Sequence, residues 1–365
     1  MHVLSLSAYA ADSHRRLVDV LTTGFPELSW TSVALAPRHY AWRAGGNALA
    51  LADRVPRSDF DLILASGPVD LAALRGLRPD LAAVRTVLYV HEHEFAYPEN
   101  AREQGRVDRQ LRQILALLAA DHVLTNSRWC ADSLLAGVDA LLARMPDEVP
   151  DGTRTRIAER IDVEPIPLAD DCFAARPLRA ARQAPVQLVW NHRHEWDKGV
   201  DRLPYLLGAL AASSQDFRFH LLGQRFRSAP PAVAESQRWL DANPRHRGHT
   251  GFLASPAAYR SLLAQSDVVL STALQEFQGL AVMEAVAQGC VPCVPDRLAY
   301  RDWVPAEARA PSFEADAQAD AEALATRLPV VLASRTAVFE ESLFALEALR
   351  FSRRRDAWRT RLLGA

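Results

Sequence analysis

The sequence predicts an α/β protein of two doubly wound domains, in which helices cover both faces of each parallel sheet. Short apolar runs of strand length alternate with longer amphipathic stretches, which is the pattern of repeated βαβ units. This rhythm stops in a polar stretch with prolines and arginines at 165–185, and it starts again at Val186. The chain of 365 residues also exceeds what one hydrophobic core usually organises and suits two domains.

The first domain is expected over residues 1–168. Its apolar runs are bounded by polar or turn residues, and between them apolar residues recur every three or four positions, which predicts helices. We expect helices at Ser13–Thr23, Val107–Ala119 and Ser127–Arg144. The expected strands are Val3–Ser7, Trp30–Leu35, Leu62–Ser66, Val87–His91, His122–Asn126 and Ile161–Ile166.

The second domain is expected over residues 180–345, and the same two patterns define its elements. The helical pattern covers Val200–Ala212 and Leu280–Gln288. The final segment, 346–365, contains a predicted helix at Ser352–Leu363 that is placed to pack back on the first domain. The expected strands of the second domain are Val186–Trp190, Phe217–Leu222, Val268–Ser271 and Cys290–Val294.

The overall composition is that of a globular protein, with 49% hydrophobic and 24% charged residues. A net charge of −2 gives no global electrostatic reason to expect nucleic-acid binding. Arginines nevertheless cluster locally, and either solvated helix faces or a bound polyanion would explain them. The two clusters are Arg102, Arg106, Arg109 and Arg112, and Arg353, Arg354, Arg355, Arg359 and Arg361.

Two features bear on location. The sequence has no uninterrupted apolar run of about 20 residues, so we expect no membrane span. It begins with a strand-like run and without a basic, apolar leader, so we expect a cytoplasmic protein. The number of subunits is not indicated by the sequence.

Two patterns raise the question of a metal. Cys290 and Cys293 form a CxxC, but no second pair accompanies it to complete a zinc site. The run His91-Glu92-His93-Glu94 places two imidazoles on one side of a strand, with no recognisable third ligand nearby. We therefore expect no metal, and no cofactor other than a co-substrate.

The most informative pair of acids is Glu276 and Glu284. Glu276 follows a predicted strand, whereas Glu284 lies on the predicted helix that begins near Leu280. Open α/β sheets bind ligands at the carboxyl ends of their strands, where helix starts favour phosphate. Gly279 allows close backbone approach, with Gln278 beside it, so this stretch predicts a sugar-nucleotide site. The alternative is that Glu284 is a solvated helix residue.

A second motif fits the same ligand. Arg193 and Lys198 lie in the loop that follows the predicted strand Val186–Trp190. The guanidinium can bind phosphate oxygens in bidentate fashion, and the ammonium supplies a compact charge. Together they would hold a diphosphate and stabilise the charge that develops when a sugar leaves. The alternative is a solvated turn in which Glu195 and Asp197 pair with both cations.

These motifs resemble those of the GT-B glycosyltransferases of family 4, which are built from two Rossmann-like domains facing a cleft. The first domain narrows the resemblance to the tRNA-queuosine α-mannosyltransferase group. The motifs that carry it are Ser13-His14, Trp42-Arg43-Ala44, Leu77-Arg78-Pro79-Asp80-Leu81, Tyr89-Val90-His91-Glu92, Tyr97-Pro98 and Asn126-Ser127.

The resemblance implies a retaining transfer of mannose from GDP-mannose to queuosine at the wobble position of tRNA-Asp. It assigns Glu276 to the sugar hydroxyls, Glu284 to the ribose, and His91 to the reacting groups. The chain departs from the family where Ala10-Ala11 replace glycines in the first loop, and where Gln278 stands at a position often aromatic or small. These departures bear on the identity of the donor.

Several first-domain residues are candidates for acceptor binding, each with a structural alternative. Trp42 and Arg43 could stack on an unpaired base and bind a phosphate, or belong to a core. Ser13, His14, Asn126 and Ser127 could line the acceptor site or cap helices. Glu92 is assigned to the acceptor through its motif, and His91 could instead be a buried structural histidine.

The function expected from the sequence is thus a metal-independent, retaining glycosyltransferase acting on queuosine-containing tRNA. We expect a front-face displacement in which the departing diphosphate helps to deprotonate the acceptor. Two alternatives remain. The acceptor could be a lipid, a polysaccharide or a small molecule, or the chain could be an inactive RNA-binding module on the same scaffold.

Overall fold

The computed structural model describes residues 1–96, 106–173, 178, 185–224 and 230–364. The predicted Tyr97-Pro98 motif and Arg102 lie outside this part of the chain. Two compact units form, one from Met1–Pro167 and Phe351–Ala365, the other from Leu168–Arg350. Each unit carries one six-stranded, wholly parallel sheet, as the alternating sequence pattern predicts.

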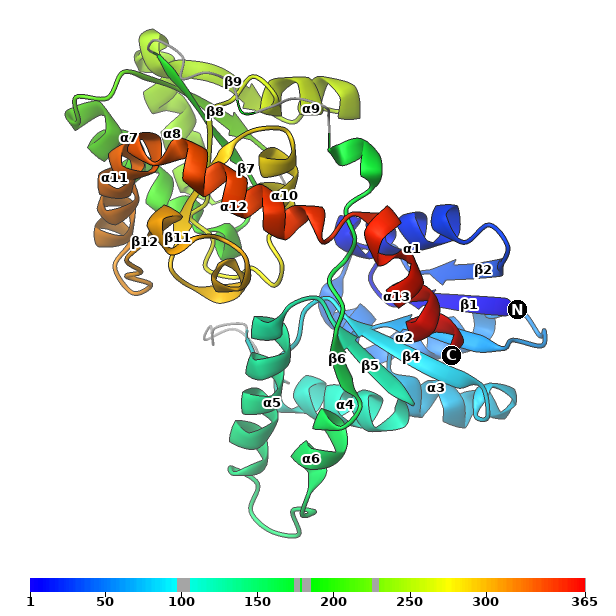
Figure 1. Cartoon of the computed structure of the whole chain (residues 1–365). Helices are drawn as coiled ribbons and strands as arrows, with labels where there is room; N and C mark the ends of the chain where they lie inside the picture. The colour runs from blue at the N-terminus through cyan, green and yellow to red at the C-terminus, as the bar shows by residue number, and fades with distance from the viewer. Residues whose placement is uncertain (97–105, 174–177, 179–184, 225–229, 365) are drawn as a thin grey trace. The chain divides into compact units, whose positions relative to one another are not determined.

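The sheet of the first unit has the strand order β2-β1-β3-β4-β5-β6. Helix α1 packs with the C-terminal helix α13, whereas α2, α3 and α4 pack in sequence beside one another on the opposite face (Figure 1). The strands are β1 (His2–Ser7), β2 (Ser29–Ala34), β3 (Leu62–Ser66), β4 (Arg85–Val90), β5 (His122–Thr125) and β6 (Ile161–Val163). The helices are α1 (Asp12–Gly24), α2 (Tyr40–Arg54), α3 (Leu71–Leu77), α4 (Arg106–Ala119), α5 (Arg128–Leu142), α6 (Thr153–Ala158) and α13 (Phe351–Leu363).

The sheet of the second unit has the order β12-β11-β10-β7-β8-β9. Its central strands are buried along their whole length, which explains their nearly continuous apolar sequences. The strands are β7 (Val186–Asn191), β8 (Phe217–Leu222), β9 (Arg247–Gly251), β10 (Val268–Leu270), β11 (Val291–Pro295) and β12 (Arg309–Ala310). The helices are α7 (Leu203–Ala212), α8 (Pro231–Ala242), α9 (Pro256–Leu263), α10 (Leu280–Ala287), α11 (Ala317–Ala333) and α12 (Arg335–Glu347).

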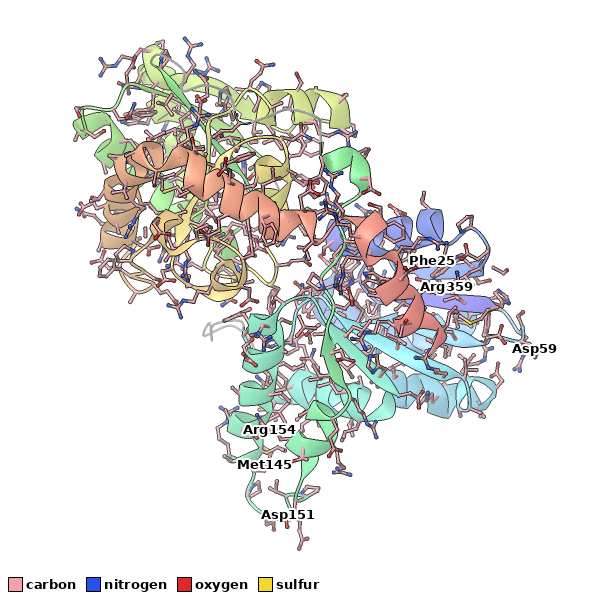
Figure 2. The ribbon with its side chains drawn as sticks, viewed as in Figure 1. Phe25, Asp59, Met145, Asp151, Arg154 and Arg359 are labelled. Atoms are coloured by element: carbon pink, nitrogen blue, oxygen red, sulfur yellow. The ribbon has the colours of Figure 1, made fainter. Side chains whose placement is uncertain are left out.

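Helix α13 belongs to the first unit although it ends the chain. Its Trp358 is fully buried and stacks on Tyr89 of β4, with ring centroids 5.7 Å apart. Phe351 contacts Phe25, which lies close to this helix in Figure 2. The first sheet is therefore covered in part by a helix that lies more than 180 residues after β6, the last strand of that sheet.

The boundaries differ from the sequence prediction where a local rule was overlooked. The segment expected as one helix from Val200 is a 3-10 turn at Val200–Arg202 followed by α7, because Pro204 fits only in the first turn of an α-helix. The strand expected up to His91 ends at Val90, and β6 ends at Val163 rather than Ile166. Strands β9 and β12 were not predicted, and neither were helices α2, α3, α6, α8, α9, α11 and α12.

Candidate functional site

The second unit has a topological switch point between β7 and β10. The chain proceeds from β7 to β8 and β9 on one side, and then returns to build β10 on the other side. At such a point the loops after the two strands diverge, which leaves a crevice for ligands. Asn191, His192 and Arg193 lie at the end of β7, and the loop Ser271–Gln278 follows β10.

Lys198 and Glu276 meet at this point. The Lys198 Nζ lies 3.3 Å from Glu276 Oε2 and donates to the carbonyl of Gln275 at 2.8 Å. Burial favours the neutral form of both groups, but the opposite charges outweigh it. The pKa of Lys198 is raised, and that of Glu276 lowered, so the pair is ionised at neutral pH. The structure thus brings together two of the predicted donor-binding residues.

The loop after β10 is held against the Lys198 turn by backbone hydrogen bonds. The carbonyl of Asp197 accepts from the amides of Leu274 and Gln275, both at 2.9 Å, and Thr272 Oγ1 donates to the carbonyl of Lys198 at 2.8 Å. Gly199, with φ +63°, makes this approach possible, because a Cβ there would lie 2.0 Å from the carbonyl oxygen of Thr272.

A buried ionic network supports the same loop from behind. Arg297 donates to the carbonyls of Ala273 at 2.8 Å and Thr272 at 3.2 Å. Asp320 of α11 receives hydrogen bonds from Arg297 and Arg202, each at 2.8 Å, and from the Phe313 amide. Burial alone would raise the pKa of Asp320, but the guanidinium of Arg297 outweighs it and holds the pKa low. The carboxylate is therefore charged and holds Arg297 against the loop that follows β10.

Helix α10 begins directly after the loop that follows β10. Gly279 precedes it with φ +89°, and its amide donates to Glu276 Oε1 at 3.1 Å, so this carboxylate is held at the N-cap residue of the helix. Leu280 is the first helical residue. Gln278 is buried, with its side-chain amide 3.7 Å from Met283 Sδ and its carbonyl held by Trp303 Nε1. The side chain of Gln278 is thus packed into the unit.

Glu284 lies about one turn after the start of α10, on the side of the helix that faces α9. Tyr259 of α9 donates to Glu284 Oε2 at 3.4 Å, and Asn191 donates to the Tyr259 hydroxyl oxygen at 2.9 Å and to the Ala281 carbonyl at 2.8 Å. These hydrogen bonds link Asn191, at the end of β7, through Tyr259 to Glu284. Sequence reasoning missed Tyr259, and it assigned no role to Asn191, which lies two residues before Arg193.

Arg193 is the more exposed member of the cationic pair. Its guanidinium is 2.7 Å from Glu195 and 3.9 Å from Asp197, with 41% of the side chain exposed. These are the ion pairs that the solvated-turn alternative predicts. Arg193 nevertheless lies only two residues after the end of β7. The structure therefore places Arg193 close enough to Lys198 to lower the pKa of its ammonium, while its guanidinium forms ion pairs with Glu195 and Asp197.

In the first unit, His14 and His91 stack on one another. Their ring centroids are 4.0 Å apart with an interplanar angle of 15°, and both side chains are buried. Burial, reinforced by His14, lowers the pKa of His91 well below its usual value, so the ring is neutral. Asn126 donates to the carbonyl of His91 at 2.8 Å and holds the residue at the end of β4.

The remaining candidates of the first unit have separate surroundings. Ser127 caps α5 by accepting from the Cys130 amide at 2.9 Å, as one of the two expectations for it predicted. Ser13 does not cap α1, because the N-cap position is Ala11. Glu92 lines a pocket on this unit together with Tyr40, Asp70, Glu94, Arg109 and Arg112.

Trp42 lies on the first turn of α2 with 59% of its surface exposed, whereas Arg43 is half-buried. Its ring covers Gly46 one turn later, where a Cβ would lie 2.9 Å from the indole. Because Gly46 has no side chain, the indole of Trp42 can pack flat along the helix while its other side is exposed to solvent. Trp42 does not belong to the core.

Within the part of the chain that the structure describes, no three His, Cys, Asp or Glu side chains are grouped so as to hold a metal ion. Cys290 and Cys293 are buried thiols, and burial raises the pKa of Cys293 to about 12. Among the same residues, no helix is both long enough and apolar enough to cross a bilayer.

The comparisons with known proteins match both units. A family model described as "tRNA-queuosine alpha-mannosyltransferase N-terminal" matches residues 2–168. A tRNA-queuosine alpha-mannosyltransferase of Drosophila melanogaster is 31% identical over 314 residues, which cover 84% of this chain and 82% of that protein.

Solved structures match nearly the whole chain. Sucrose-phosphate synthase of Thermosynechococcus elongatus superposes with a TM-score of 0.68 at 15% identity, covering 96% of both chains. The Anabaena protein HepE, solved with UDP and glucose, gives 0.66 at 14% identity, covering 98% of both. These likenesses confirm the predicted GT-B fold.

Proposed function

Because the chain belongs to the tRNA-queuosine α-mannosyltransferase family, we propose that it transfers a mannosyl group from GDP-mannose to queuosine in tRNA-Asp. The preformed Lys198–Glu276 pair at the switch point of the second unit is the observation that carries the donor part of the proposal. The acceptor part rests on family membership and on the first unit, where the family model matches.

Each donor-site residue has a role in this proposal. Arg193 and Lys198 bind the diphosphate, which also approaches the amides at the start of α10 near Gly279 and Leu280. Glu276 accepts hydrogen bonds from sugar hydroxyls, and Glu284, oriented by Tyr259, accepts them from the ribose. Gln278 contributes through the backbone, since its side chain is packed against Met283.

The proposed reaction is a retaining, front-face displacement that uses no metal. The bond between the anomeric carbon and the diphosphate oxygen breaks, and the acceptor oxygen forms its bond on the same face. The proton of the acceptor hydroxyl passes to the departing diphosphate. Lys198 and Arg193 stabilise the charge that grows there. A glycosyl-enzyme trapped on Glu276 would contradict this mechanism.

The first unit supplies His91 and the acceptor-binding residues. A neutral His91 can donate one hydrogen bond and accept another without adding charge at the reacting sugar. The exposed indole of Trp42, with Arg43 beside it, offers a stacking surface for an unpaired base of the anticodon loop. Ser13, His14, Glu92, Asn126 and Ser127 are retained as acceptor-side residues, of which His14 and Asn126 act by holding His91. A cytoplasmic location is part of the proposal.

The experiment compares two forms of tRNA-Asp, one with queuosine and one with guanosine at the wobble position, each incubated with GDP-mannose. Mass spectrometry of the digested nucleosides should show a hexose added only to queuosine, with release of GDP. The Glu276→Gln variant should abolish transfer while retaining its fold. When a lipid or saccharide is added to the same assay as a second acceptor, transfer to it with none to tRNA would support the alternative acceptor and overturn the tRNA assignment.

The donor is tested separately by thermal shift. A ligand that binds only the folded protein stabilises it by RT ln(1 + [L]/Kd), which is about 2.7 kcal/mol at a hundredfold excess over Kd. GDP-mannose should raise the melting temperature of the wild type and not that of Lys198→Met. A larger shift with UDP-galactose or another sugar nucleotide would reassign the donor, and no shift with any of them would favour an inactive RNA-binding module.

A further inference from the structure

His192 is a buried polar side chain for which the site described so far has no use. It is the first residue after β7, with 3% of its surface exposed. Its Nε2 is buried and has no hydrogen-bond partner among the residues that the structure describes. An unsatisfied buried polar atom costs roughly 1–3 kcal/mol, so its position in a native protein calls for an explanation.

The charged neighbours of His192 are the donor-site residues themselves. The charges of Glu276, Lys198, Asp197 and Arg193 are close enough to shift the pKa of the imidazole. These come from the loop after β10 and from the turn after β7, so the ring lies where the two loops diverge. The imidazole therefore lies near the charged residues of the proposed donor site.

The local packing fixes this ring in place. Trp190 packs edge-on against it, with ring centroids 5.1 Å apart and an angle of 68°. Gly223, at the end of β8 with φ +135°, lets the neighbouring strand approach, because a Cβ there would lie 1.8 Å from the His192 carbonyl oxygen. Neither contact satisfies a ring nitrogen.

Burial lowers the pKa of His192 to about 4, so the imidazole is neutral at physiological pH. A neutral imidazole has one N–H donor and one acceptor. It can thus add a hydrogen bond to a site in which Lys198 is already paired with Glu276, without adding charge that would need a counter-ion.

We propose that His192 binds the donor, with its Nε2–H donating to an oxygen of the phosphate that carries the sugar. Phosphate oxygens are acceptors only, and His192 is adjacent to Arg193 and near Lys198, the two residues that would bind the same diphosphate. This inference rests on the proposed nucleotide-sugar function, but not on the tRNA acceptor. The role is that of a binding and positioning residue.

The test measures binding of a nucleoside monophosphate, a nucleoside diphosphate and the sugar nucleotide by calorimetry, without tRNA. The nucleotide series is the one that gives the largest thermal shift with the wild type, beginning with GMP, GDP and GDP-mannose. His192→Phe keeps the ring volume and removes the nitrogens. We expect about a tenfold loss of affinity for GDP and GDP-mannose and less than a twofold change for GMP.

Two further variants separate binding from structure. His192→Asn restores a side-chain N–H and should recover part of the GDP affinity. His194→Phe is the matched control, because His194 is a buried histidine of the same loop whose Nε2 lies 3.3 Å from the Leu222 carbonyl oxygen. The ratio of GMP to GDP affinity should not change in this control, and melting temperatures verify that each variant folds.

The outcomes are distinct. An unchanged GMP-to-GDP affinity ratio in His192→Phe and His192→Asn would overturn the inference and leave the nitrogen to a buried water. A loss seen with GDP-mannose but not with GDP would overturn the assignment to the phosphate. Failure of the wild type to bind any sugar nucleotide would overturn the proposed function, and this inference with it.

Discussion

Replacing Asp320 by asparagine tests whether the buried network beneath the donor site determines the stability of the second unit. The carboxylate is fully buried and accepts four hydrogen bonds at 2.8 Å, three from Arg202 and Arg297 and one from the Phe313 amide. Asparagine preserves the shape but removes the negative charge. Two guanidinium groups, 1% and 3% exposed, then lose their shared counter-ion.

Breaking a buried ion pair on one side costs about 3–5 kcal/mol. For a unit of this size each kcal/mol lowers the melting temperature by about 2–4 °C, so we expect a decrease of roughly 6–20 °C. The assay is differential scanning calorimetry of the whole chain. Glu322→Gln is the control, because Glu322 is an exposed carboxylate of the same helix and should change stability by less than about 0.5 kcal/mol.

The pH dependence gives a second readout. The folded-state pKa of Asp320 lies below its unfolded value of about 3.9, so its stabilisation is complete above that value and is lost as the pH falls through the folded-state pKa. The difference between wild type and Asp320→Asn should therefore be constant from pH 5 to 8 and shrink only in strong acid. Equal melting temperatures for the Asp320 and Glu322 variants at pH 7 would refute the reasoning.

Two further predictions concern the first unit. If the exposed ring stacks on a base, Trp42→Ala should weaken tRNA binding in a gel-shift assay by about 1–3 kcal/mol, and Gly46→Ala should also weaken it by displacing the ring. Phe344→Ala is the control and should have no effect, because it removes an 81% exposed aromatic side chain of the second unit. Equal tRNA binding by all three variants would contradict the stacking role. Arg354→Met should destabilise the unit at pH 7 by about 3 kcal/mol, because it leaves buried Glu164 without its principal partner. Burial outweighs Arg354 and raises the pKa of Glu164, so protonation of Glu164 should reduce the destabilisation as the pH falls. A loss of stability in thermal melts that stayed constant or grew from pH 7 to pH 5 would show that the charge of Glu164 is not responsible.

The fold could be predicted because its strands are short, apolar and buried. Leu62–Ser66 and Phe217–Leu222 were predicted with their observed bounds, since polar or turn residues delimit them on both sides. Strand β9 was missed because its sequence, Arg247–Gly251, is polar and ends in glycine. Helix α2 was missed because two consecutive glycines interrupt its pattern, and one of them is explained only by the indole that covers it.

The candidate site could be predicted only where its residues are local in the sequence. Lys198 and Glu276 each lie in a short motif that follows a strand, and the topology of a parallel sheet was enough to expect them at one edge. Tyr259 and Asp320 reach the same region from distant helices, and no local pattern marks them. They are separated from these partners by 23 to 118 residues, so only the three-dimensional structure identifies them.

The Lys198–Glu276 contact has a consequence for donor binding under the proposed function. In the free protein the ammonium already has three oxygen neighbours, from Gln275, Glu276 and Asp197 at 2.8, 3.3 and 3.4 Å. A diphosphate that binds Lys198 must therefore share or replace one of them, and the Gln275 carbonyl is the shortest. If the diphosphate replaces the contact between Lys198 and Glu276, the Glu276 carboxylate becomes free to accept hydrogen bonds from sugar hydroxyls. Nucleoside diphosphate alone would leave that carboxylate buried without a new partner, so the hexose should contribute to affinity even though it carries no charge.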